Sequence, residues 1–102
     1  MHHTRNAAFE DLAHHADAIL DSHGILRAVD EDAWCWQLGG NRVYLGEDLT
    51  ELGFSISLHR LCQESGGEKY WQCDHGSDRY VESPAQPEQI AEAIERRLTI
   101  GT

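Results

Sequence analysis

The spacing of apolar residues predicts a helix at each end of the chain and strands between them. Residues 5–23 carry apolar side chains at three- and four-residue intervals, which is typical of an amphipathic helix. Gly24 can end this helix in a left-handed conformation, with Ile25 folding back onto Leu20. A second helix is predicted from Pro87, whose missing N–H costs nothing at a first helical position.

The middle of the chain alternates between apolar and polar residues, which is the period of half-buried strands. Glycine-rich stretches at 39–41 and 63–68 predict hairpin turns, and "DHGSD" at 74–78 predicts a third turn. The alternating runs are residues 25–29, 33–38, 42–46, 54–62, 69–73 and 79–82.

This order of elements predicts an α+β fold. We expect a two-layer sandwich, in which the N-terminal and C-terminal helices pack on one face of an antiparallel five- or six-stranded meander sheet. A chain of 102 residues fits a single domain spanning 1–102.

The aromatic residues of the strands divide between the two faces of the predicted sheet. Trp34 and Trp36 share one face and are expected in the core, with Cys35 on the other face. Tyr44 and Trp71 are expected on the other face or at an edge. Exposed Trp and Tyr are frequent anchors of protein interfaces, so these two and Tyr80 are candidate binding residues.

The formal charge is −10, from 18 acidic and 8 basic residues. Direct nucleic-acid binding and anionic membrane binding are disfavoured, because both need a basic face. Residues 10–51 hold ten carboxylates and two arginines. On the first helix, Glu10, His14, Asp17 and Asp21 form one polar stripe, which we expect to face solvent.

The stretch "YWQCDHGSDRY" at 70–80 crowds reactive residue types together. Its Cys73 and His75 lack the spacing of common zinc sites. Asp74 and Asp78 would raise the pKa of a nearby thiol, which opposes cysteine catalysis. We therefore expect turn chemistry here, and neither catalytic residues, a metal nor a cofactor.

Three cysteines are an odd number, which favours a reducing compartment over a disulfide scaffold. The N-terminal residues turn acidic too early for a signal peptide, and no apolar run approaches the roughly 20 residues of a membrane span. The sequence thus predicts a cytoplasmic protein.

Together these features predict a small, acidic, non-catalytic binding protein. Carboxylates would replace phosphates on a basic surface of a partner, such as a nucleic-acid-binding complex, and so inhibit it. In size and charge the chain is similar to phage-encoded anti-CRISPR proteins and to toxin-neutralising immunity proteins. The expected partner-binding residues are Asp30, Glu31, Asp32, Glu47, Asp48, Tyr44, Trp71, Asp74 and Asp78.

Two alternative functions stay open. The chain could be an adaptor or secretion-type chaperone that binds an amphipathic peptide on its sheet face or edge strand. It could also be a small Cys/His metal or redox protein. A homodimer through the exposed sheet face is compatible with each function, and the acidity by itself could act simply to keep the chain soluble.

Overall fold

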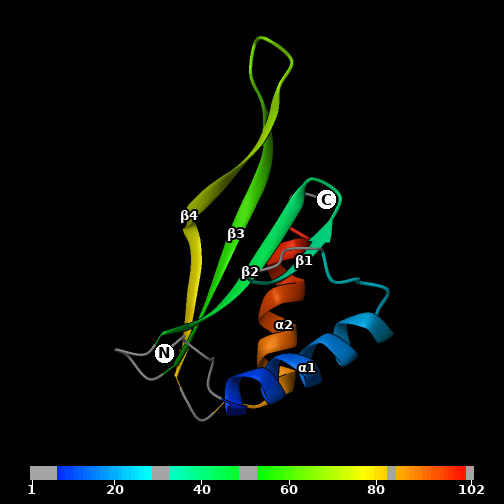
Figure 1. Ribbon diagram of the computed structural model, residues 1–102, viewed down its shortest axis with the longest axis vertical. Helices are drawn as coiled ribbons and strands as arrows, with labels where there is room; N and C mark the ends of the chain where they lie inside the picture. The colour runs from blue at the N-terminus through cyan, green and yellow to red at the C-terminus, as the bar shows by residue number, and fades with distance from the viewer. Residues whose placement is uncertain (1–6, 29–32, 49–52, 83–84, 101–102) are drawn as a thin grey trace, which may run out of the picture.

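The computed structural model describes residues 7–28, 33–48, 53–82 and 85–100 (Figure 1). The strands form one antiparallel sheet in the order β1-β2-β3-β4, and a bridge between Arg27 and Trp36 adds a short segment beyond β1. The predicted α+β meander is thereby confirmed. The elements are α1 (Ala7–Ser22), β1 (Trp34–Leu38), β2 (Asn41–Asp48), β3 (Gly53–Gln63), β4 (Lys69–Glu82) and α2 (Pro87–Leu98).

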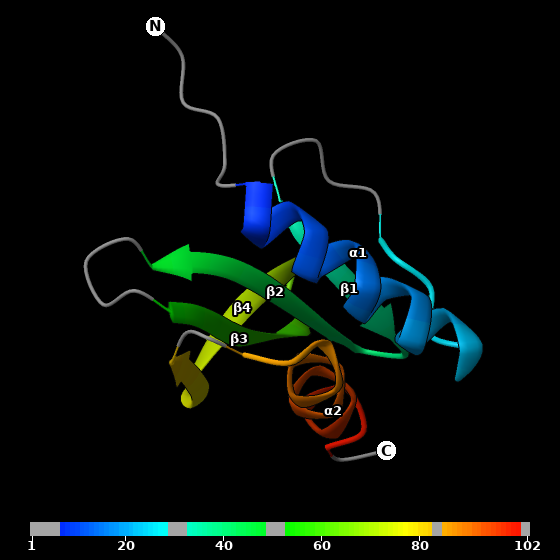
Figure 2. The same ribbon diagram turned by 90° about the horizontal axis from the view of Figure 1, so that it is seen from below.

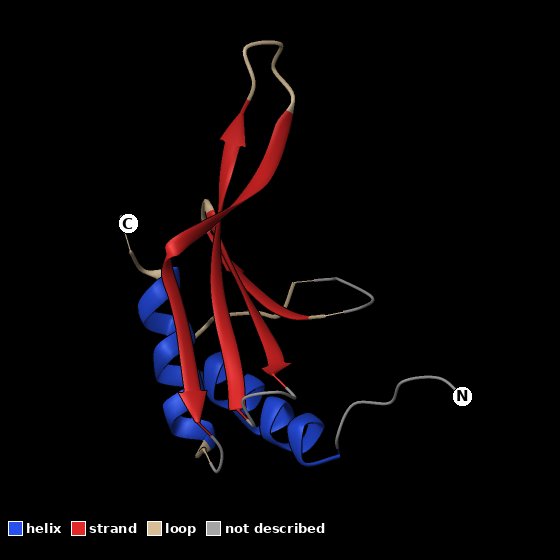
Figure 3. Ribbon diagram, turned by 90° about the vertical axis from the view of Figure 1, so that its left-hand side faces the viewer, coloured by secondary structure: helices blue, strands red, loops and turns tan. Residues whose placement is uncertain are grey.

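Both helices lie on the same face of the sheet, and they cross rather than run side by side (Figures 2 and 3). The end of α1 has the predicted form: Gly24 has a φ of 81°, and the Ile25 N–H donates to the Leu20 carbonyl over 2.9 Å. At the start of α2, Gln86 and Gln89 form a capping box. Local sequence signals therefore set where each helix begins or ends.

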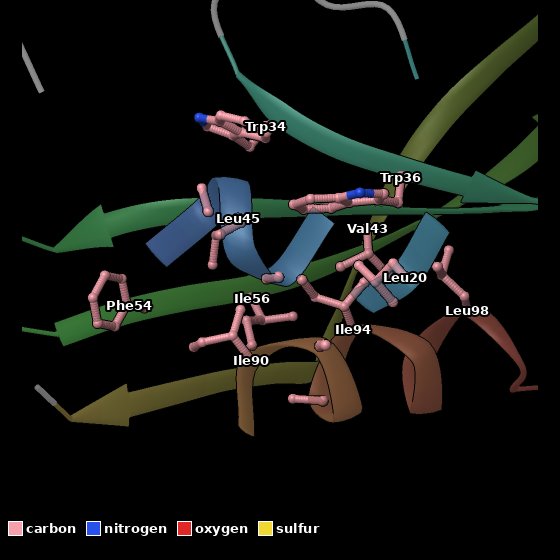
Figure 4. Packing of buried hydrophobic residues seen from close by; sticks show 14 of the residues in the cluster. Leu20, Trp34, Trp36, Val43, Leu45, Phe54, Ile56, Ile90, Ile94 and Leu98 are labelled. Atoms are coloured by element: carbon pink, nitrogen blue, oxygen red, sulfur yellow. The ribbon is translucent and has the colours of Figure 1, made fainter. Parts of the chain in front are cut away.

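The core lies between the helices and the covered face of the sheet (Figure 4). Trp34 and Trp36 are buried there, as predicted, with their rings stacked at 6.0 Å. From the start of α1, Phe9 reaches Phe54 of β3 with a ring separation of 5.8 Å. Ile90, Ile94 and Leu98 form the apolar stripe of α2 and are fully buried.

The polar stripe of α1 does not face solvent throughout, so this part of the prediction is wrong. Asp17 accepts a hydrogen bond from the Trp36 indole N–H over 2.8 Å, and Glu10 accepts one from Trp34 over 3.2 Å. His14 is exposed but meets the Trp34 ring edge-on. A buried indole N–H needs an acceptor, and the crossing of α1 over the tryptophans supplies two carboxylates.

The "DHGSD" stretch is not a hairpin turn, so that prediction is also wrong. β4 runs without a break from Lys69 to Glu82 and contains both predicted strands. Its partners jump from Leu58 opposite Asp74 to Ile56 opposite Arg79, so residues 75–78 form a bulge opposite Ser57. Gly, Asp and Ser here signal a departure from regular strand geometry rather than a reversal of the chain.

The turn predicted at 63–68 is confirmed: the chain reverses at residues 64–68, at the tip of a long ribbon made by β3 and β4 (Figure 1). β2 begins at Asn41, which pairs with Arg60 of β3. The next pair along β3 and β4, Leu61 with Trp71, therefore lies beyond the edge of β2. We call residues 61–71 the β3–β4 arm. The Leu61 N–H donates to the Gly40 carbonyl over 2.9 Å and ties the base of the arm to the turn between β1 and β2.

Candidate functional site

A row of polar side chains crosses the sheet on the face opposite the helices; Figure 3 shows the helices on the other side of the strands. The register places Gln37 beside Arg42, Arg42 beside His59, and His59 beside Cys73, which crosses all four strands. Alternation within each strand puts these residues on the face that the helices leave uncovered. This open face is where a partner could reach the sheet directly.

Arg42 is the centre of the contacts on this face. Its guanidinium donates to the Gln37 side-chain oxygen over 2.7 Å and to the Tyr44 hydroxyl over 3.3 Å. It also lies over the Trp71 ring, 4.4 Å from the centroid. Tyr44 in turn meets the His59 ring edge-on at 4.6 Å. We call Arg42, Tyr44, His59 and Trp71 the aromatic patch; all four are half-buried.

Apolar side chains continue the aromatic patch toward both ends of β4. Leu61, paired with Trp71 on the arm, is 40% exposed, and Tyr80, opposite Ser55, is 37% exposed. Tyr80 packs against Gly53, where an added Cβ would lie 2.5 Å from the tyrosine Cζ. A glycine is therefore required at position 53 for the tyrosine ring to lie across the sheet.

The structure brings together two of the three aromatic residues predicted for binding. Tyr44 and Trp71 share the open face, and both touch Arg42. Sequence reasoning missed Arg42 and His59 as members of the same surface. Arg42 and Tyr44 are two residues apart on one strand, and this spacing could have placed both on the same face. The approach of Trp71 to Arg42 depends on the pairing of distant strands.

The predicted acidic residues do not join the aromatic patch where the structure describes them. Asp74 lies opposite Leu58 on the helix side of the sheet and pairs with Arg60 over 3.1 Å. Glu47 lies opposite the buried Phe54, and Asp78 is exposed in the bulge of β4. Asp48 belongs to β2, but its side chain is outside the described part, as are residues 30–32 in full.

Two thiols pair with residues of the aromatic patch: Cys35 lies opposite Tyr44, and Cys73 lies opposite His59. Burial raises the pKa of the Cys73 thiol, and the carboxylates of Asp78 and Asp74 raise it further, as the sequence predicted. The thiolate is the reactive form of cysteine, so a raised pKa keeps Cys73 protonated and unreactive at neutral pH.

We expect Asp78→Asn to speed alkylation of Cys73 by iodoacetamide at pH 7.5 by roughly two- to fivefold, because removing the carboxylate increases the thiolate fraction. Peptide mass spectrometry would separate Cys73 from Cys35 and Cys62. Asp21→Asn, an equal charge change on exposed α1, should leave the rate unchanged. An unchanged rate in Asp78→Asn would contradict the electrostatic account.

Other hollows lie outside the open face. One, of about 520 Å³, lies between α1 and α2 and has Ile19 and Ala91 among its lining residues. A smaller one, of about 210 Å³, lies beside the Arg60–Asp74 pair. Within the described residues, no group of three or more His, Cys, Asp or Glu is placed to hold a metal ion. No helix in that part of the chain is long and apolar enough to cross a membrane.

Comparison with known proteins finds no matching family model, no matching curated protein and no matching solved structure.

Proposed function

We propose that this chain is a non-catalytic binding protein that occupies a basic surface of a protein partner, with the aromatic patch at the centre of the contact. The observation that carries the proposal is the linked set of Arg42, Tyr44 and Trp71 on an uncovered sheet face. These three residue types are the ones most enriched among energetically dominant interface residues. Their mutual contacts also hold them in place before a partner arrives, which lowers the entropic cost of binding.

The acidic charge has a separate role in this proposal. The patch itself contains no carboxylate, so the net charge of −10 acts over distance rather than through contacts at its centre. Such a field speeds encounter with a basic partner and orients it, while aromatic anchors slow dissociation. Inhibition of a nucleic-acid-binding complex, in the manner of anti-CRISPR or toxin-immunity proteins, is the specific form of this function that we propose.

Trp71→Ala is expected to weaken capture of the partner at least tenfold, because a central interface tryptophan contributes about 2 kcal/mol or more. The partner would be captured from native cell extract by immobilised protein and its dissociation constant measured after purification. Tyr70→Ala is the matched control, since Tyr70 is the adjacent aromatic, is 43% exposed, and pairs with Cys62 on the opposite face of the arm. Equal losses in the two variants would contradict the assignment of the open face.

Two experiments test the role of charge in partner binding: a change of NaCl concentration and the reversal of acidic residues. Raising NaCl should slow association more than it speeds dissociation. Reversal of Glu47 and Asp48, or of residues 30–32, should weaken binding more than reversal of Glu92 or Glu95 on α2. Affinity that does not change between low and moderate salt would rule out a basic partner.

A second candidate function rests on the edge of the sheet. β4 is a strand of 14 residues that borders only β3 among the described strands. An extended peptide could add to this edge through main-chain hydrogen bonds, as adaptors and chaperones bind their targets. Binding of that kind would be insensitive to salt, which separates it from the first proposal.

A further inference from the structure

Three arginines meet at one cavity, although the chain has only eight basic residues in all. The cavity measures about 380 Å³ and lies between the second half of β4 and α2. Arg79 comes from β4, and Arg96 and Arg97 come from the last turn of α2. The other lining residues are Val81, Gln89, Glu92 and Ala93, so one carboxylate faces three guanidinium groups.

Simpler roles account for each arginine separately. Arg96 and Arg97 complement the negative end of the α2 dipole. Arg79 lies opposite Ile56, on the helix side of the edge strand, where an inward charge discourages pairing with another sheet. Neither role requires the three side chains to line the same cavity, and neither accounts for its size.

The cavity concentrates positive charge in a chain that is otherwise strongly negative. Burial lowers the pKa of the Arg97 guanidinium, and nearby Arg79 and Arg96 lower it further, while Asp78 opposes them. Arg96 pairs with Glu92 over 2.9 Å, but both side chains are 72% exposed, so this pair compensates little. Crowded guanidinium groups of this kind are relieved by a bound anion.

We propose that this cavity, the arginine pocket, binds a phosphate monoester dianion through Arg79, Arg96 and Arg97. Guanidinium forks match the spacing of phosphate oxygens and donate two parallel hydrogen bonds. Gln89 can add a neutral donor. Its side-chain oxygen accepts a hydrogen bond from the Gln86 backbone N–H over 2.8 Å, so its side-chain NH₂ group can donate to the phosphate. The volume falls within the roughly 300–1,000 Å³ of ligand sites, so the phosphate can carry an attached group.

The arginine pocket is independent of the proposed partner surface. Arg79 lies on the helix side of β4, whereas the neighbouring Tyr80 lies on the open face. A phosphate ligand and a protein partner could therefore be bound at the same time, and failure of one proposal leaves the other intact.

The test is a titration with inorganic phosphate at pH 7.5, followed by NMR of the arginine Nε–Hε groups at constant ionic strength. We expect saturable shifts at Arg79, Arg96 and Arg97, with a dissociation constant on the order of 1 mM, a strength within reach of so small a ligand. Arg42 and Arg60 should not shift. Shifts that do not saturate, or that chloride reproduces at the same ionic strength, would overturn the proposal.

Three variants sharpen the test. Arg79→Gln should weaken phosphate binding about tenfold, the loss expected for one charge-assisted contact. Lys69→Gln is the matched control, since it removes the same charge from the exposed end of the arm and should have little effect. Asp78→Asn should strengthen binding, because it removes the carboxylate that competes for Arg97. Equal losses in Arg79→Gln and Lys69→Gln would show that net charge, and not the pocket, attracts phosphate.

The protonation of the ligand gives a further readout. The second pKa of a phosphate monoester is about 6, so lowering the pH from 7.5 to 5 should weaken binding while the arginines stay charged. Phosphoserine and adenosine monophosphate as probes identify whether the attached group is a protein side chain or a nucleoside. Binding that is unchanged at pH 5 would contradict recognition of a dianion.

Discussion

Trp36→Ala should lower the free energy of unfolding by about 4 kcal/mol. Trp36 is completely buried between the sheet and α1, and its ring stacks on Trp34. Truncation opens a cavity. It also removes the indole N–H group that donates a hydrogen bond to Asp17 over 2.8 Å. Because small domains have only about 5–15 kcal/mol of stability, this variant should be partly unfolded at 37 °C. Urea denaturation followed by far-ultraviolet circular dichroism would measure the loss.

Two companion variants keep this prediction testable if the alanine variant does not fold. Trp36→Phe retains a ring and should lose about 1–3 kcal/mol, from the lost donor to Asp17 and the smaller volume. Trp71→Ala makes the same chemical change on the open face and should cost less than about 1 kcal/mol. A Trp71→Ala loss as large as that of Trp36→Ala would mean that the open face is covered by another layer.

Asn41→Asp should destabilise the fold by about 3–5 kcal/mol at pH 7, through the burial of an unpaired charge. Asn41 starts β2, is 5% exposed, and its amide nitrogen donates to the carbonyls of Leu98 and Ile100 over 2.9 and 2.8 Å. Aspartate has nearly the same shape but would place a carboxylate against two carbonyl oxygens. These oxygens lie at the negative end of the α2 dipole, which adds to the repulsion.

The effect of Asn41→Asp should depend on pH in a defined direction. Burial and the two carbonyls would raise the pKa of the new carboxyl above its unfolded value of about 3.9. The variant therefore loses stability as the pH rises above about 4, and its pH-dependent deficit disappears at lower pH. Gln72→Glu is the control, since it makes the same amide-to-acid change at an exposed site and should stay within about 0.5 kcal/mol. Urea midpoints of both variants at pH 3.5 and pH 7 would decide the matter.

The fold and part of the candidate site could be predicted from local patterns. Periods of three to four and of two residues identified both helices, the alternating strands and the burial of Trp34 and Trp36. The left-handed Gly24 at the end of α1 and the start of α2 at Pro87 could be predicted because their signals lie in the adjoining residues. Burial is the larger cause of the raised pKa of Cys73, and the neighbouring carboxylates predicted only the contribution that they add to it. Each of these properties depends on groups that are close together in the chain.

The remaining features arise from contacts between distant segments. The pairing of β4 with β3 decided that "DHGSD" forms a bulge and does not reverse the chain. The glycine and the aspartates do not encode this pairing. Asp17 became an acceptor for Trp36 because α1 crosses the sheet instead of lying alongside α2. The meeting of Arg79 with Arg96 and Arg97 likewise depends on how α2 packs against β4. Periodicity determines which face of an element is apolar, but the packing of elements determines what each polar side chain meets.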